Sequence, residues 1–135
     1  MNTARVNGTA SDRPAGERPT ILVVEDEWLI AMDIEGMLED AGFAVCGPAG
    51  RVDEALALIE TRRVDLGLLD VNLAGQQSYP VAAALREKGR PFLFLSGHSE
   101  AHLHDEFRDE RLINKPIEPN RLIRLVEEIL AVAPQ

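Results

Sequence analysis

The chain has 135 residues, of which 45% are hydrophobic and 27% charged, the balance of one soluble globular domain rather than a disordered chain. Its 14 basic and 23 acidic residues give a formal net charge of −9, which argues against a nucleic-acid binder and against docking on anionic lipid, since both need basic surfaces. The single cysteine, Cys46, cannot form an internal disulfide, and no secretory signal or apolar run of roughly 20 residues is present, so the cytoplasm is the expected compartment.

Residues 1–19 are predicted to form a disordered leader. After Met1, Val6 is the one large branched apolar residue in this stretch, and glycine, proline, serine, threonine and asparagine interrupt any periodicity. Such a stretch cannot bury enough apolar surface to offset the entropy lost on ordering. We therefore expect residues 20–135 to form the folded domain, with no room for an output domain after the last helix.

Short apolar runs alternate with amphipathic stretches from residue 20 onward. The runs predict strands at 21–24, 43–46, 66–69, 92–95 and 112–113, the second ended by Gly47-Pro48. The amphipathic stretches predict helices at 28–41, 52–59, 79–88 and 122–129, and a fourth helix in chain order is expected after Gly97.

The apolar runs lack the alternation that marks a sheet with one face in water. Five alternations of strand and helix predict an α/β fold, a parallel sheet with helices on both faces. In such folds ligands bind beyond the carboxyl ends of the strands, so functional side chains are expected there.

Three acidic residues stand at two of these strand ends, Glu25 and Asp26 after the first strand and Asp70 after the third. If the two strands are adjacent, the carboxylates converge in a crevice about 5 Å wide. Like charges that close need protons or a cation, and Mg²⁺ favours carboxylates, water and phosphate oxygens. The alternative interpretation is an acidic first turn of a helix, which the helix dipole favours.

Two further polar residues end the fourth and fifth strands. Ser96 closes the fourth, and Lys115, one of two lysines, follows the fifth. A hydroxyl and an ammonium aimed at the same crevice suit an anion held between metal and lysine, and phosphate is the obvious anion. Taken singly, Ser96 could cap a helix and Lys115 could be a solvated loop charge. The strand-end placements together favour the functional interpretation.

At these strand ends the sequence resembles the receiver domains of response regulators. The resemblance rests on Ile-Leu-Val-Val-Glu25-Asp26-Glu, Leu-Leu-Asp70-Val-Asn72, Phe-Leu-Ser96-Gly97 and Asn-Lys115-Pro116, and covers residues 20–132. It implies a flavodoxin-like, doubly wound sheet of five parallel strands in the order 2-1-3-4-5, with helices on both faces.

The resemblance also implies an Mg²⁺ site beside a phosphoacceptor. Asp70 is the implied acceptor and, with Asp26, a side-chain ligand of the metal, while Glu25 acts through water and Asn72 through its backbone carbonyl. The phosphoryl oxygens are the implied partners of two further residues, Ser96 and Lys115.

The function implied is that of a stand-alone receiver in a two-component phosphorelay. A histidine kinase or phosphotransfer protein supplies the phosphoryl group, and the receiver assists its own phosphorylation without being a turnover enzyme. It then signals to a downstream protein target, without direct nucleic-acid or membrane contact, through a face expected over residues 98–132.

The sequence departs from the common receiver pattern in three places. Leu112 replaces an aromatic residue that rotates with the switch in many receivers, so the switch is expected to run through residues 97–109. Ala74 replaces a frequent proline, and residues 75–78 predict a longer, softer loop. Ser96-Gly97 replaces the usual Ser/Thr-Ala and resembles an alphaproteobacterial subgroup without the aromatic switch residue.

Two other functions use similar residues. A phosphatase of the haloacid-dehalogenase type also has an aspartate nucleophile with Mg²⁺, but it needs a second aspartate where Asn72 stands and carries its nucleophile on the first strand. A receiver fold that serves only as a non-phosphorylated binding scaffold would usually have lost the acceptor or the acidic residues, and both are present.

Overall fold

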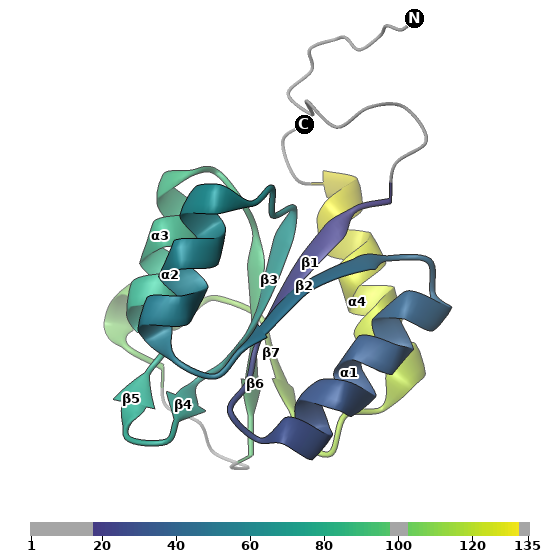
Figure 1. Cartoon of the computed structure of the whole chain (residues 1–135), viewed down its shortest axis with the longest axis horizontal. Coiled ribbons are helices and arrows are strands. Elements are labelled where there is room, and N and C mark those ends of the chain that lie inside the picture. The colour runs from purple at the N-terminus through teal and green to yellow at the C-terminus, as the bar shows by residue number, and fades with distance from the viewer. Residues whose placement is uncertain (1–17, 98–102, 133–135) are drawn as a thin grey trace, which may run out of the picture.

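The computed structural model describes residues 18–97 and 103–132, in which one sheet is covered by helices on both faces (Figure 1). The sheet strands are β1 (Thr20–Val24), β2 (Ala44–Ala49), β3 (Leu66–Asp70), β6 (Phe92–Ser96) and β7 (Leu112–Asn114). The helices are α1 (Trp28–Asp40), α2 (Val52–Thr61), α3 (Tyr79–Glu87), α4 (Pro119–Val132) and one turn of 3₁₀ helix, η1 (Asp105–Phe107). The leader expected over residues 1–19 lies outside this description except for its last two residues.

The sheet has the order β2-β1-β3-β6-β7, and every neighbouring pair is parallel. Counted along the chain these are strands 2-1-3-4-5, so the predicted doubly wound topology is confirmed. The pairing that matters for the site is between β1 and β3, where Val24 is in register with Leu69. The residues that follow these two positions therefore leave the sheet side by side.

The two faces of the sheet are each buried under a pair of helices, α1 and α4 on one side and α2 and α3 on the other (Figure 1). Alternate residues of β1 serve opposite faces: Ile21 and Val23 belong to the first layer of the core, Leu22 and Val24 to the second. Burial of each such side chain stabilises the fold by about 1.5–3 kcal/mol. Two buried faces explain why the strands read as continuous apolar runs. Among the described helices, none is both long and apolar enough to cross a membrane.

Strand β2 continues through Gly47-Pro48, so the prediction that these residues end it was wrong. The register passes from Leu22–Cys46 to Val24–Ala49, which places the pair in a bulge. Gly47 has a φ of +94°, and a side chain there would clash with the backbone nitrogen of Ala49. Proline is tolerated because β2 is an edge strand.

The residues after Asp70, which were expected to form a longer loop, form a short hairpin. Its strands are β4 (Asn72–Leu73) and β5 (Gln76–Gln77), which pair antiparallel around a turn at Gly75, where φ is +90°. Leu73 is buried in the core layer under α2 and α3 and anchors the hairpin. Strands of two residues are too short to produce a periodic signal in the sequence.

The fourth helix expected after Gly97 is not seen in the described part of that segment. Residues 103–109 contain only η1, and residues 98–102 lie outside the described chain. Two apolar residues, Leu103 and Phe107, occur in 103–109, and Phe107 is fully buried. One buried anchor in a polar stretch supports a turn rather than a long amphipathic helix.

Candidate functional site

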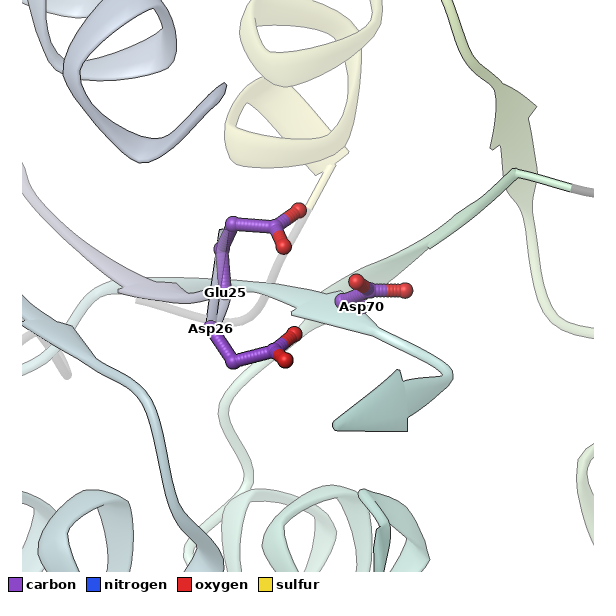
Figure 2. Close-up of side chains that lie close together, drawn as sticks. All are labelled: Glu25, Asp26 and Asp70. Atoms are coloured by element: carbon purple, nitrogen blue, oxygen red, sulfur yellow. The ribbon is translucent and has the colours of Figure 1, made fainter. Parts of the chain in front are cut away.

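The ends of β1 and β3 bring three carboxylates together. Glu25 and Asp26 follow β1 and Asp70 ends β3, and each offers an oxygen within 4.8 Å of the others (Figure 2). Glu25 and Asp70 are buried, whereas Asp26 is exposed at the mouth of the crevice. The structure thus gathers the three acidic residues that were expected to converge.

Backbone hydrogen bonds fix the end of β1. The Glu25 N–H donates to the carbonyl of Ala49 at 2.9 Å, which ties β1 to the edge strand β2. The Glu27 N–H donates to Oε2 of Glu25 at 2.9 Å, which turns the Glu25 side chain back over the end of the strand. Glu25 is thereby held in one orientation toward the crevice.

Lys115 lies among these carboxylates. Its Nζ is 2.6 Å from Oε1 of Glu25, 2.9 Å from Oδ2 of Asp70 and 3.7 Å from Oε1 of Glu27. Its backbone N–H donates to the carbonyl of Ser96 at 2.7 Å, so the strand end at β7 is bonded to the strand end at β6. Lys115 supplies the positive charge nearest to Asp70 in the described structure.

Burial and charge pull on the titrating groups in opposite directions. Burial raises the pKa of Glu25, and the neighbouring Asp70 charge adds to this, although Lys115 and the Glu27 N–H oppose it. Burial alone would lower the pKa of Lys115, but its bonds to Glu25 and Asp70 outweigh burial, so the pKa of Lys115 is raised. Lys115 therefore stays protonated at neutral pH, and Glu25 is the acid whose ionisation burial opposes.

Replacing Glu25 with glutamine should stabilise the metal-free protein more at pH 8 than at pH 4. The pKa of Glu25 is raised above 4.5 on folding, so the stability this residue contributes below pH 4.5 is lost as pH rises through its folded pKa. Glutamine has no such proton to lose. Denaturant unfolding in a chelator measures the difference, and an equal effect of the substitution at both pH values would contradict it.

The donor set fits a hard divalent cation. The three carboxylates of Glu25, Asp26 and Asp70 face one lysine, so the crevice keeps surplus negative charge. Oε1 of Glu25 is buried, and the Lys115 ammonium lies 2.6 Å from it. An all-oxygen site with three carboxylates suits Mg²⁺ better than a transition metal.

Asn72 and Ser96 border the same crevice. Asn72 begins β4, and its backbone N–H donates to Oδ1 of Asp70 over 3.4 Å. Ser96 is buried at the end of β6, one position beyond Leu95, which is in register with Asp70. The structure therefore places every predicted site residue around the carboxyl ends of neighbouring strands.

Two contacts in and near the site were not predicted from the sequence. Glu27 lies near the lysine, and its place in the run Glu25-Asp26-Glu27 could have indicated this. The second contact is made by Gln76 in the hairpin that follows Asp70, whose side chain reaches the start of α2, 24 residues away in sequence. A contact between residues so far apart leaves no local pattern to read.

The sequence and the fold match known proteins. Residues 21–127 match the family described as the response regulator receiver domain. The chain is 30% identical over 130 residues to the transcriptional regulatory protein PdtaR of Mycobacterium tuberculosis, covering 95% of this chain and 63% of PdtaR. It is 34% identical over 114 residues to the phyllosphere-induced regulator PhyR of Methylorubrum extorquens, covering 82% of this chain and 43% of PhyR. The chain thus spans less than two thirds of these relatives.

Solved structures match at similar identity. SdrG from Sphingomonas melonis is 38% identical, with a TM-score of 0.75 over 85% of this chain and 98% of SdrG. The BeF3-activated conformation of SdrG from Pseudomonas melonis is 36% identical, with a TM-score of 0.72 over the same shares.

Proposed function

The chain belongs to the response regulator receiver domain family, and from that premise we propose that Asp70 accepts a phosphoryl group from a phosphohistidine of a kinase or phosphotransfer protein. The observation that carries the proposal is the position of Asp70, buried among two further carboxylates and one lysine at the carboxyl edge of the sheet. The similarity to SdrG, which has a BeF3-activated conformation, supports it.

In the proposed reaction a carboxylate oxygen of Asp70 bonds to phosphorus while the bond from phosphorus to the histidine nitrogen breaks, and the imidazole leaves with the bonding pair. The product is an acyl phosphate. Lys115, 2.9 Å from Oδ2 of Asp70, is close enough to pair with the transferred oxygens. Ser96, at the adjoining strand end, is the hydroxyl proposed to donate to one of them.

Mg²⁺ is the proposed cofactor. Asp26 and Asp70 would hold it by their side chains, Glu25 through water and Asn72 through its backbone carbonyl. When bound, the metal reduces repulsion between the attacking carboxylate and the anionic phosphoryl group. The chain's own contribution is to hold Asp70 fixed against Lys115.

Incubation with acetyl phosphate tests the function directly. The wild-type chain should gain one phosphoryl group by intact mass when Mg²⁺ is present and none in excess chelator, and hydroxylamine should remove the group, as expected of an acyl phosphate. A chain that is never phosphorylated, or is phosphorylated on a serine, would refute the proposal.

The phosphodonor protein is proposed to dock on α1. This helix begins beside the acidic crevice and exposes three large apolar side chains, Trp28 at 67%, Leu29 at 71% and Met32 at 47%. A separate cavity of about 370 Å³ lies along another face of the same helix, lined by Ile30, Asp33, Ile34, Met37, Lys115, Pro116 and Ile117. Exposed apolar surface beside a reacting centre fits a protein donor better than a small one.

Replacing Leu29 with serine should slow phosphotransfer from a phosphohistidine protein about tenfold, since it removes an apolar contact at the proposed interface. The rate with acetyl phosphate should stay at the wild-type value. Val132, exposed at 76% at the C-terminal end of α4, gives a matched control as Val132→Ser. Equal slowing by both variants, or slowing with acetyl phosphate, would contradict the docking surface.

The remaining properties follow from the same proposal. The chain assists its own phosphorylation but is not a turnover enzyme, and its output is a contact with a downstream protein rather than with nucleic acid or membrane, in keeping with its net charge of −9. Cys46 is a buried free thiol, which suits the cytoplasm as the compartment.

A further inference from the structure

The β4–β5 hairpin follows Asp70 after a single residue. Asn72 pairs with Gln77 and Leu73 with Gln76, and the Ser78 N–H closes the hairpin by donating to the carbonyl of Val71 at 3.0 Å. Any movement of the hairpin as a unit therefore moves Asn72 relative to Asp70.

The hairpin is fastened to α2 by Gln76. The Oε1 of Gln76 accepts the N–H of Val52, the first residue of α2, at 3.2 Å. The residue before this helix, Arg51, makes no side-chain capping bond, so Gln76 supplies from outside a partner for one amide that a helix N-terminus leaves unpaired.

The turn that leads from β2 into α2, at Gly50, lies beside Asp26. A Cβ atom added to Gly50 would lie 3.6 Å from the Cα of Asp26, and the carbonyl of Ala49 accepts the N–H of Glu25. The hairpin, the start of α2 and the end of β1 thus form a continuous chain of contacts from Asp26 around to Asp70.

We propose that Gln76 is a positioning residue, which through the Val52 N–H fixes the hairpin, and with it the backbone of Asn72, against the crevice and so sets its affinity for Mg²⁺. This inference rests on the proposed function, in which the Asn72 carbonyl holds the metal. It adds a residue outside the receiver signatures to the determinants of metal binding.

The hairpin needs the contact with Gln76 because it is small. Two-stranded hairpins are marginally stable on their own, and this one has two residues in each strand. Without Gln76, the buried side chain of Leu73 is its remaining side-chain anchor among the contacts described above. If the hairpin is docked on α2 for only part of the time, the apparent affinity for Mg²⁺ is the intrinsic affinity multiplied by the docked fraction.

The test compares two adjacent glutamines. Gln76→Ala should raise the Mg²⁺ dissociation constant about threefold to tenfold, the range expected for loss of one hydrogen bond. Gln77, also exposed and on the same strand, gives the control Gln77→Ala, which should bind as wild type. The fluorescence of Trp28, the sole tryptophan, two residues after Asp26, reports binding.

Amide hydrogen exchange without Mg²⁺ provides a second measurement. Exchange in residues 72–78 should speed up in Gln76→Ala and return toward wild type in Gln76→Glu, because a carboxylate oxygen can still accept the Val52 N–H. If Gln76→Ala speeds exchange but keeps wild-type affinity, Gln76 is only a helix cap and the inference is wrong. Equal weakening by Gln76→Ala and Gln77→Ala would also overturn it. A wild-type chain that fails to bind Mg²⁺ would refute the proposed function as well.

Discussion

Replacing Asp70 with asparagine is expected to lower phosphorylation by at least about a thousandfold, to the background of the assay, because an amide oxygen is a poor nucleophile. Asparagine keeps the volume of the buried side chain, and its carbonyl oxygen can still accept from Nζ of Lys115. The loss should therefore be chemical rather than structural. Transfer rates from acetyl phosphate and from a phosphohistidine protein measure it.

The matched control is at the other end of the same strand. Asp65, immediately before β3, is as buried as Asp70, each being 6% exposed, but accepts from the Thr20 N–H and pairs with Arg63. Asp65→Asn should reduce stability and leave the rate of phosphorylation near wild type. A rate in Asp70→Asn within tenfold of wild type, with the phosphoryl group still labile to base and to hydroxylamine as an acyl phosphate, would show that another carboxylate is the acceptor.

The main features of the fold and site can be predicted from the sequence because they follow from burial. Strands buried on both faces leave unbroken apolar runs, which predict a parallel sheet, and a parallel sheet gathers its carboxyl ends at one edge. Glu25, Asp26 and Asp70 could therefore be expected to converge without any knowledge of their side-chain contacts.

The features that could not be predicted depend on contacts between distant residues. The hairpin after Asp70 is stabilised by Leu73 in the core and by Gln76 on α2, and neither contact has a local pattern. The bulge at Gly47-Pro48 depends on β2 being at the edge of the sheet, which is a property of the topology. A glycine followed by proline predicts the end of a strand unless the strand is known to lie at the edge of the sheet.

The structure of the segment after Ser96 could not be predicted either, because the residues that hold it in place belong to α3. The ring of Phe107 stacks on Tyr79 with centroids 5.4 Å apart, and the Arg86 guanidinium lies 4.4 Å from the centroid of the same ring. The His104 N–H donates to the Tyr79 hydroxyl at 3.1 Å, and Arg86 donates to the carbonyl of Glu106 at 3.2 Å. The η1 turn is therefore held on α3. The strand that precedes this segment, β6, ends in the site at Ser96.

Replacing Lys115 with methionine is expected to abolish the response of this η1 region while leaving Asp70 able to bind beryllofluoride. Lys115 joins Asp70 to the end of β6, the strand that precedes this region, since its ammonium contacts Asp70 and its backbone N–H donates to the carbonyl of Ser96. Leu112 offers no aromatic ring to carry the change by rotation. In the wild type, beryllofluoride should change amide exchange in residues 103–110 about tenfold, since segments with few buried contacts open and close readily.

Lys88, the other lysine of the chain, provides the control for this experiment. It is exposed and lies 3.7 Å from Glu60 on the far side of the sheet from α1, so Lys88→Met should keep the full wild-type change. Because methionine removes the cation that competes for Glu25 and Asp70, Mg²⁺ should bind to Lys115→Met at least as tightly as to wild type. A wild-type exchange response in Lys115→Met, or no response in a wild-type chain whose Asp70 is occupied, would show that the η1 region is uncoupled from the site.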